Sequence, residues 1–73
     1  MENNIRVLRR SLGLSQHRLG KKVGVSRITI NYIENEKTIP SLSLADKIAN
    51  ALDTPLNKVF KLESDNDFIL LAE

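Results

Sequence analysis

Apolar residues recur along the chain at the three- and four-residue intervals of amphipathic helices, and glycine or proline separates the periodic segments. In the first segment, about residues 3–12, the apolar stripe consists of Ile5, Leu8 and Leu12. Gly13 suits the left-handed conformation that commonly follows a helix end. The pattern therefore predicts a first helix that stops just before Gly13.

Two serines mark the starts of the next two helices. The side chains of Ser15 and Ser26 can accept hydrogen bonds from the free amides of the following turn, as N-caps do. They predict helices over residues 16–23 and 27–34, with Gly24 in the tight turn between them. Two short helices that meet at such a turn are typical of a helix-turn-helix unit.

Gly20 lies inside the second predicted helix, where glycine costs about 1 kcal/mol relative to alanine. Either another stretch of backbone passes close to this position, or a weak helix former is simply tolerated. The sequence leaves both interpretations open.

Two further helices follow a loop at residues 35–40. Ser41 is expected to cap the fourth helix, whose inward positions are Leu44, Ala45, Ile48 and Leu52. Thr54 is expected to cap a short fifth helix with Pro55 at its first position. The apolar face of this helix consists of Leu56, Val59 and Phe60. Short helices joined by short links predict a compact all-α domain of five helices.

Composition narrows the classes of function. The chain of 73 residues holds one domain, and without cysteine it has neither disulfides nor a thiolate metal site. No apolar run approaches the roughly 20 residues of a membrane span and no signal peptide is visible, so we expect a cytoplasmic protein without membrane contact. His17 has no second ligand cluster, and no nucleophile–base set accompanies it. We therefore expect no enzyme activity, metal or cofactor.

Charge is unevenly distributed along the chain. Residues 1–38 carry eight Lys or Arg and three Asp or Glu, a balance of +5, whereas residues 39–73 carry three and six, a balance of −3. The first half can therefore attract a polyanion. A chance asymmetry on a solvated surface is the alternative interpretation.

An ordered set of residues carries a family resemblance. Its members are Leu12-Gly-Leu-Ser-Gln16, Leu19, Val23-Gly-Val-Ser-Arg27, Ile30, Ile33-Glu-Asn35 and Pro40-Ser-Leu42. At these spacings the chain resembles the Cro/C1-type helix-turn-helix family of phage repressors and xenobiotic-response-element-like bacterial regulators. The resemblance implies a lambda-repressor-like DNA-binding domain at residues 5–60, with its helix-turn-helix unit at about 16–35 and a tail at 61–73.

The family's usual activity sets the functional expectation. The resemblance implies a sequence-specific regulator of transcription, a repressor that binds an inverted-repeat operator in double-stranded DNA as a homodimer. The alternative is an antitoxin or another protein-interaction module of the same fold, which holds a protein partner through the apolar tail.

Four residues at the start of the third helix are the candidate base contacts. In the major groove Arg27 can pair bidentately with guanine, and Asn31 can do so with adenine. Ile28 or Tyr32 can contact a thymine methyl group, although the Tyr32 ring could equally lie on the sugar-phosphate chain. In the family these positions read bases.

Backbone phosphates are expected to contact Arg10, Gln16, Ser26, Asn35, Lys37 and Thr38. Gln16 opens the second helix, whose dipole favours an anion. The resemblance assigns Asn35, Lys37 and Thr38 to a loop that clamps the DNA backbone. Four other basic residues of the first half are further candidates for phosphate contacts, but we favour a solvated face for them: Arg6, Arg18, Lys21 and Lys22.

The resemblance also implies a partly buried ion pair of structural role between Arg9 and Glu34. The family often has glycine just past the third helix, where this chain has Glu36. We therefore expect Asn35 to take the left-handed conformation, which asparagine tolerates, and Glu36 to point away from the DNA.

The apolar residues 68–71 in the tail have three open interpretations. They can fold back on the core, pair with a second copy or dock on another protein, and we favour self-association. Residues 61–63 could add a short strand, as in some small members of the family.

Overall fold

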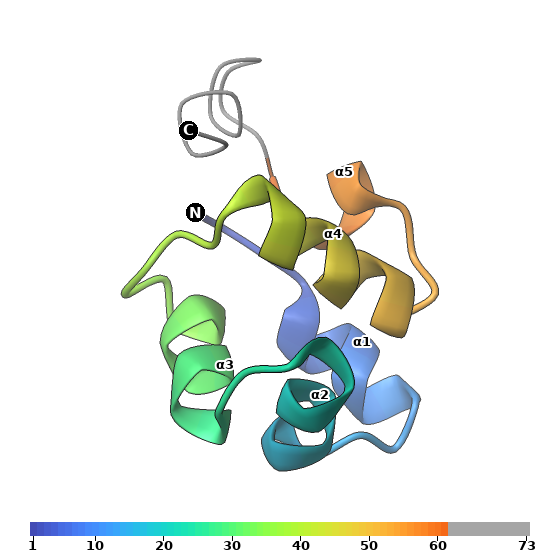
Figure 1. The fold of residues 1–73 in the computed structure, drawn as a ribbon. Helices are drawn as coiled ribbons and strands as arrows, with labels where there is room; N and C mark the ends of the chain where they lie inside the picture. Colours follow the sequence, from blue (N-terminus) through green and yellow to red (C-terminus); the bar gives the residue numbers. More distant parts are fainter. Residues whose placement is uncertain (62–73) are drawn as a thin grey trace.

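The computed structural model describes residues 1–61, which form five helices. The helices are α1 (Ile5–Ser11), α2 (Gln16–Val23), α3 (Arg27–Glu34), α4 (Leu42–Ala51) and α5 (Leu56–Val59). The all-α, lambda-repressor-like fold expected from the sequence is therefore confirmed, and the predicted bounds of α2 and α3 are correct. Figure 1 shows α2 and α3 packed side by side. Helix α4 lies between this pair of helices and α5.

Serine N-caps begin the three longest helices. The hydroxyl groups of Ser15, Ser26 and Ser41 each accept a hydrogen bond from the backbone amide three residues later, at 3.0, 3.2 and 3.1 Å. These bonds satisfy amides that the helix itself leaves without an acceptor. The predicted caps of these helices are therefore confirmed.

Three local predictions are wrong, namely the cap at Thr54, Pro55 as the first residue of the fifth helix and Leu12 in the buried stripe of the first. Thr54 does not cap α5, because its hydroxyl donates to the Leu52 carbonyl (2.9 Å) at the end of α4. Pro55 has an extended ψ of 145°, so it precedes the helix rather than opening it. Leu12 is 50% exposed, because α1 ends at Ser11 and the chain turns at Gly13 (φ +70°).

The core lies between the inward faces of the helices. Its fully buried side chains include Ile5, Leu19, Ile30, Ile33, Ile48, Val59 and Phe60. The inward positions predicted for α4 are confirmed, with Ala45, Ile48 and Leu52 buried and Leu44 packed against the core. Because α2 packs on both α3 and α4, the core fixes the helix-turn-helix unit on the rest of the domain.

Gly20 sits beneath the turn between α2 and α3. A β-carbon placed there would lie 2.6 Å from the Val25 carbonyl oxygen and 3.3 Å from the Ser26 backbone. Gly24 ends α2 in the left-handed conformation (φ +82°), and the Val25 amide donates to the Gly20 carbonyl at 2.9 Å. The interpretation of close backbone approach is therefore correct.

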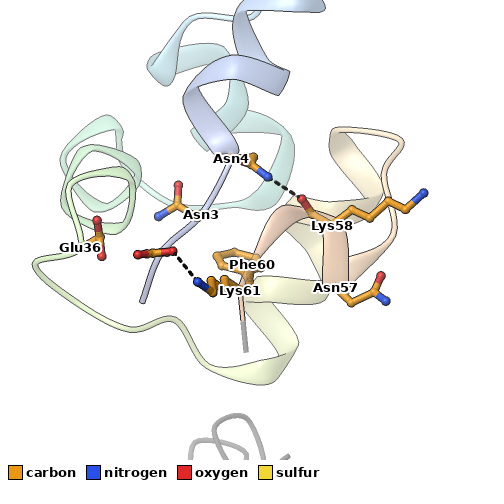
Figure 2. A pocket seen from close by; sticks show the side chains of 8 residues that line it. Asn3, Asn4, Glu36, Asn57, Lys58, Phe60 and Lys61 are labelled. Carbon is orange, nitrogen blue, oxygen red and sulfur yellow. Dashed lines mark hydrogen bonds and ion pairs between the residues drawn. The ribbon is translucent and has the colours of Figure 1, made fainter. Parts of the chain in front are cut away.

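The N-terminal residues join the ends of α3 and α5. The Asn3 side chain donates to the Ile33 carbonyl (2.9 Å), and the Asn4 side chain donates to the Lys58 carbonyl (3.0 Å; Figure 2). Asn3 also forms a single antiparallel bridge with Phe60. The strand expected at residues 61–63 stays a prediction, because residues 62–63 lie outside the described residues, as do the apolar residues 68–71.

We predict that Gly20→Ala lowers the free energy of unfolding by about 1 kcal/mol, because the new methyl group meets backbone that cannot rotate away. Helix propensity alone predicts a gain of about 1 kcal/mol. Urea denaturation decides between the two signs. Lys21→Ala, on the exposed side of the same helix, is the control and should change stability by less than about 0.5 kcal/mol.

Candidate nucleic-acid interface

The third helix has two different sides. Its inward side buries Ile30 and Ile33, whereas Ile28 and Tyr32 on the outward side are 56% and 47% exposed. Single exposed apolar side chains are ordinary, and Val7 is more exposed still at 70%, so what distinguishes Ile28 and Tyr32 is that they lie four residues apart on one side of α3. The sequence pattern already separated these two sides, and the structure agrees with it.

The outward side of α3 meets the start of α2 in a shallow hollow. The hollow has a volume of about 340 Å³ and is lined by Gln16, Arg27, Ile28, Asn31 and Tyr32. A guanidinium, two carboxamides and two apolar groups thus converge on one concave surface. These groups match the acceptors, donors and methyl groups that base edges present in the major groove.

Glu34, the last residue of α3, binds polar side chains from two other helices, α1 and α2. Arg9 binds both of its carboxylate oxygens, with Nε 3.1 Å from Oε2 and Nη2 3.0 Å from Oε1. The Glu34 side chain is 0% exposed, and the remaining Arg9 amino group donates to the Leu14 carbonyl at 3.0 Å. The ion pair expected between Arg9 and Glu34 is therefore present, and it ties α1 and the following loop to the end of α3.

Two further donors reach the same carboxylate, and sequence reasoning missed both. Gln16 donates from Nε2 to Oε2 at 3.3 Å, and Arg6 donates from Nε to Oε1 at 3.4 Å. The only signal in the sequence was the i, i+3 spacing of Arg6 and Arg9, which puts them on one side of α1. Placing Gln16 beside Glu34 required the packing of α2 against α3.

Three other residues predicted to contact phosphates lie near the two ends of α3, namely Ser26, Asn35 and Lys37. Asn35 donates from Nδ2 to the Asn31 carbonyl at 2.9 Å, so its side chain folds back along α3. The Lys37 ammonium lies 5.7 Å from the centre of the Tyr32 ring, within the range of a cation–π contact. The Ser26 hydroxyl accepts a hydrogen bond from the Thr29 amide (3.2 Å) as the N-cap of α3.

Arg10 and Thr38 are exposed and do not line the hollow. Arg10 lies in the last turn of α1, and Thr38 lies in the loop between α3 and α4. The structure therefore leaves their contact with DNA as a prediction.

The prediction for the end of α3 is wrong in one detail. Asn35 has φ −91°, and Glu36 adopts the left-handed conformation with φ +61°. The Lys37 amide donates to the Tyr32 carbonyl (2.9 Å) and the Glu36 amide to the Ile33 carbonyl (3.1 Å). These two hydrogen bonds form a Schellman motif. In this motif the left-handed residue comes two positions after the last helical residue, and because α3 ends at Glu34, that residue is Glu36 rather than Asn35.

A second hollow, of about 760 Å³, lies between the N-terminal residues and α5 (Figure 2). None of the predicted site residues lines it. Within residues 1–61, no cluster of three or more His, Cys, Asp or Glu could hold a metal ion. None of the helices within residues 1–61 has the length and apolar character that a membrane span requires.

Known proteins are similar to this chain in sequence and in fold. Residues 5–59 match the family described as helix-turn-helix. The uncharacterized HTH-type transcriptional regulator YgzD of Bacillus subtilis (strain 168) is 44% identical over 66 residues, which cover 90% of this chain and all of that protein. An uncharacterized HTH-type transcriptional regulator of Methanocaldococcus jannaschii is 43% identical over 65 residues, 89% of this chain and 98% of that protein.

A solved structure extends the similarity to three dimensions. The P22 c2 repressor, crystallised in complex with the synthetic operator 9T, superposes with a TM-score of 0.76 at 33% sequence identity. The match covers 80% of this chain and 88% of that one. The chain therefore belongs to the Cro/C1-type helix-turn-helix family, whose members are DNA-binding regulators of transcription.

We predict that Glu34→Ala lowers the free energy of unfolding by about 3 kcal/mol or more, because it leaves the buried Arg9 guanidinium without its carboxylate. Glu36→Ala removes only a long, half-exposed contact of 3.8 Å to the N-terminal amino group and should cost less than about 1 kcal/mol. Thermal denaturation of both variants measures the difference. Equal losses would contradict the structural role of Glu34.

We predict that Glu36→Gly raises the free energy of unfolding by about 0.5–1 kcal/mol, because glycine adopts the left-handed conformation without the steric cost that Glu36 bears. Lys37→Gly, at the next position, is the control and should bring no gain. Urea denaturation distinguishes the two, and a destabilised Glu36→Gly variant would contradict the steric cost assigned to Glu36.

Proposed function

We propose that this protein is a sequence-specific repressor that binds an inverted-repeat operator as a homodimer, with α3 lying in the major groove of each half-site. The observation that carries the proposal is the hollow at the start of α2 and α3, where polar and apolar side chains suited to base edges converge. The operator-bound P22 c2 repressor, which shares the fold, supports it. In the proposed dimer the two α3 helices lie about 34–36 Å apart, one turn of DNA.

Each residue of the hollow has a separate role in this proposal. Arg27 donates two hydrogen bonds to guanine, and Asn31 exchanges two with adenine. Ile28 contacts a thymine methyl group, and Tyr32 contacts either a methyl group or the sugar-phosphate chain. The half-exposed apolar side chains and the two polar groups lie on one side of the helix, so they can engage neighbouring base pairs together.

Phosphate contacts position the domain without reading sequence. We assign them to Gln16 and Ser26 at the helix starts, to Asn35, Lys37 and Thr38 after α3, and to Arg10 on α1. Gln16 and Ser26 stand at helix N-termini, where the backbone amides and the helix dipole favour an anion.

The proposal predicts an inverted-repeat footprint on the DNA upstream of the protein's own gene. Arg27→Ala should lose discrimination at one G·C pair per half-site, by about 1–3 kcal/mol for each bidentate contact. Footprinting followed by competition with single-base variants of the protected site measures this loss. Lys47→Ala, on the exposed side of α4, is the control and should keep the wild-type preference.

Two results would refute the proposal. A wild-type protein that binds every duplex equally does not read sequence. An Arg27→Ala variant with unchanged preference shows that α3 does not make the base contact assigned to it.

Thymine contacts can be tested within the protected site. Replacing the contacted thymine by deoxyuridine removes one methyl group, which is worth about 0.8 kcal/mol, or roughly fourfold in affinity, per half-site. We expect wild-type protein to show this loss and Ile28→Ala to show little further loss, because the side chain that covers the methyl group is gone. Equal losses for both proteins would exclude Ile28 as the contact.

A further inference from the structure

Arg6 occupies an unexpected position beside the proposed DNA-binding surface. From α1 it reaches across to the end of α3, where Nη2 lies 3.1 Å from the Asn35 side-chain oxygen and Nε lies 3.4 Å from Glu34 Oε1. Its side chain is nevertheless 49% exposed. The sequence favoured a solvated face over a phosphate contact for Arg6, but the structure holds its side chain against the end of α3.

The charge of Arg6 is not cancelled there. Glu34 carries one negative charge, and Arg9 already binds both of its oxygens in a pair that is almost completely buried. The contact of Arg6 with the same carboxylate is longer and half exposed, so solvent weakens it. The three charged groups therefore leave one positive charge in excess, and Arg6 presents it to solvent.

This excess charge lies next to the outward side of α3, which faces the DNA in the proposed function. Asn35 is four residues after Asn31 and its side chain bonds the Asn31 carbonyl, so it extends the outward side of α3 past the helix end. The Arg6 guanidinium donates to the side-chain oxygen of Asn35 at this position beyond the helix end. Gln16, which lines the hollow, donates to the other carboxylate oxygen of Glu34. Arg6 and Gln16 thus flank a single buried carboxylate at the edge of the surface.

We propose that Arg6 is a phosphate-contacting residue, oriented by Asn35 and Glu34; this inference rests on the proposed function. A guanidinium has five N–H donors, and the bonds to Asn35 and Glu34 use two of them. Donors therefore remain for the oxygens of a DNA phosphate, which guanidinium binds in a paired geometry. Because the side chain is already held in place, little conformational freedom is lost when the phosphate binds.

Phosphate contacts do not depend on sequence, so the test does not need the operator. The probe is a fluorescein-labelled 30-base-pair duplex of mixed sequence, titrated at several salt concentrations. Each phosphate contact contributes about 0.9 to the slope of log affinity against log salt concentration. We expect Arg6→Gln to reduce that slope by about this amount and to weaken binding of all duplexes by the same factor.

Two further variants separate a DNA contact from a role in stability. Lys47→Gln removes one positive charge from the exposed side of α4 and should leave the slope near that of wild type. Arg6→Lys keeps the charge and should restore most of the slope, although its ammonium cannot reproduce the paired geometry. Melting temperatures of all three variants, measured without DNA, show how much of any loss comes from unfolding.

The outcomes are distinct. If Arg6→Gln keeps the wild-type slope, or loses no more of it than Lys47→Gln, Arg6 does not contact phosphate and the inference is wrong. A lower melting temperature with an unchanged slope also contradicts the inference, because it shows a purely structural role. Wild-type protein that binds no duplex would instead overturn the proposed function itself.

Discussion

The hydrogen-bonded ion pair at the buried carboxylate of Glu34 is the interaction on which the end of the domain with the proposed DNA-binding surface depends. Removing a carboxylate from water is costly, and only a full set of donors makes it tolerable. Arg9 provides two of these donors from α1 and Gln16 provides one from α2, while Glu34 itself ends α3. The charge therefore requires three helices to meet at one point, and that requirement fixes the orientation of α3 relative to α2.

Backbone geometry adds a second constraint on the same pair of helices. The Val25 carbonyl lies so close to Gly20 that no side chain fits between them, and Gly24 turns the chain in the left-handed conformation. At the far end of α3, the Asn3 side chain bonds the Ile33 carbonyl. The helix is thus held at both ends as well as along its buried side, so its outward side chains are presented by a rigid support.

Structural support and the proposed recognition of DNA are divided among neighbouring residues of α3. Ile30 and Ile33 are buried and hold α3 on the core, whereas Ile28 and Tyr32 remain exposed beside the hollow. Asn35 links the two functions, because it extends the outward side of α3 and also binds Arg6.

The sequence alone determined the bounds of α2 and α3, the serine caps and the inward and outward sides of the helices, because these depend on side chains within a few residues of one another. It did not determine the left-handed residue after α3, the reason for Gly20 or the exposure of Leu12. Nor did it show that Arg6 and Gln16 join Glu34, since 28 and 18 residues separate them along the chain. Only the tertiary structure decided the contacts at Glu34, because they arise where packed helices bring distant segments together. The features at Gly20, Leu12 and Glu36 depend instead on the exact course of the backbone through the turns that follow the helices, which side-chain patterning does not specify.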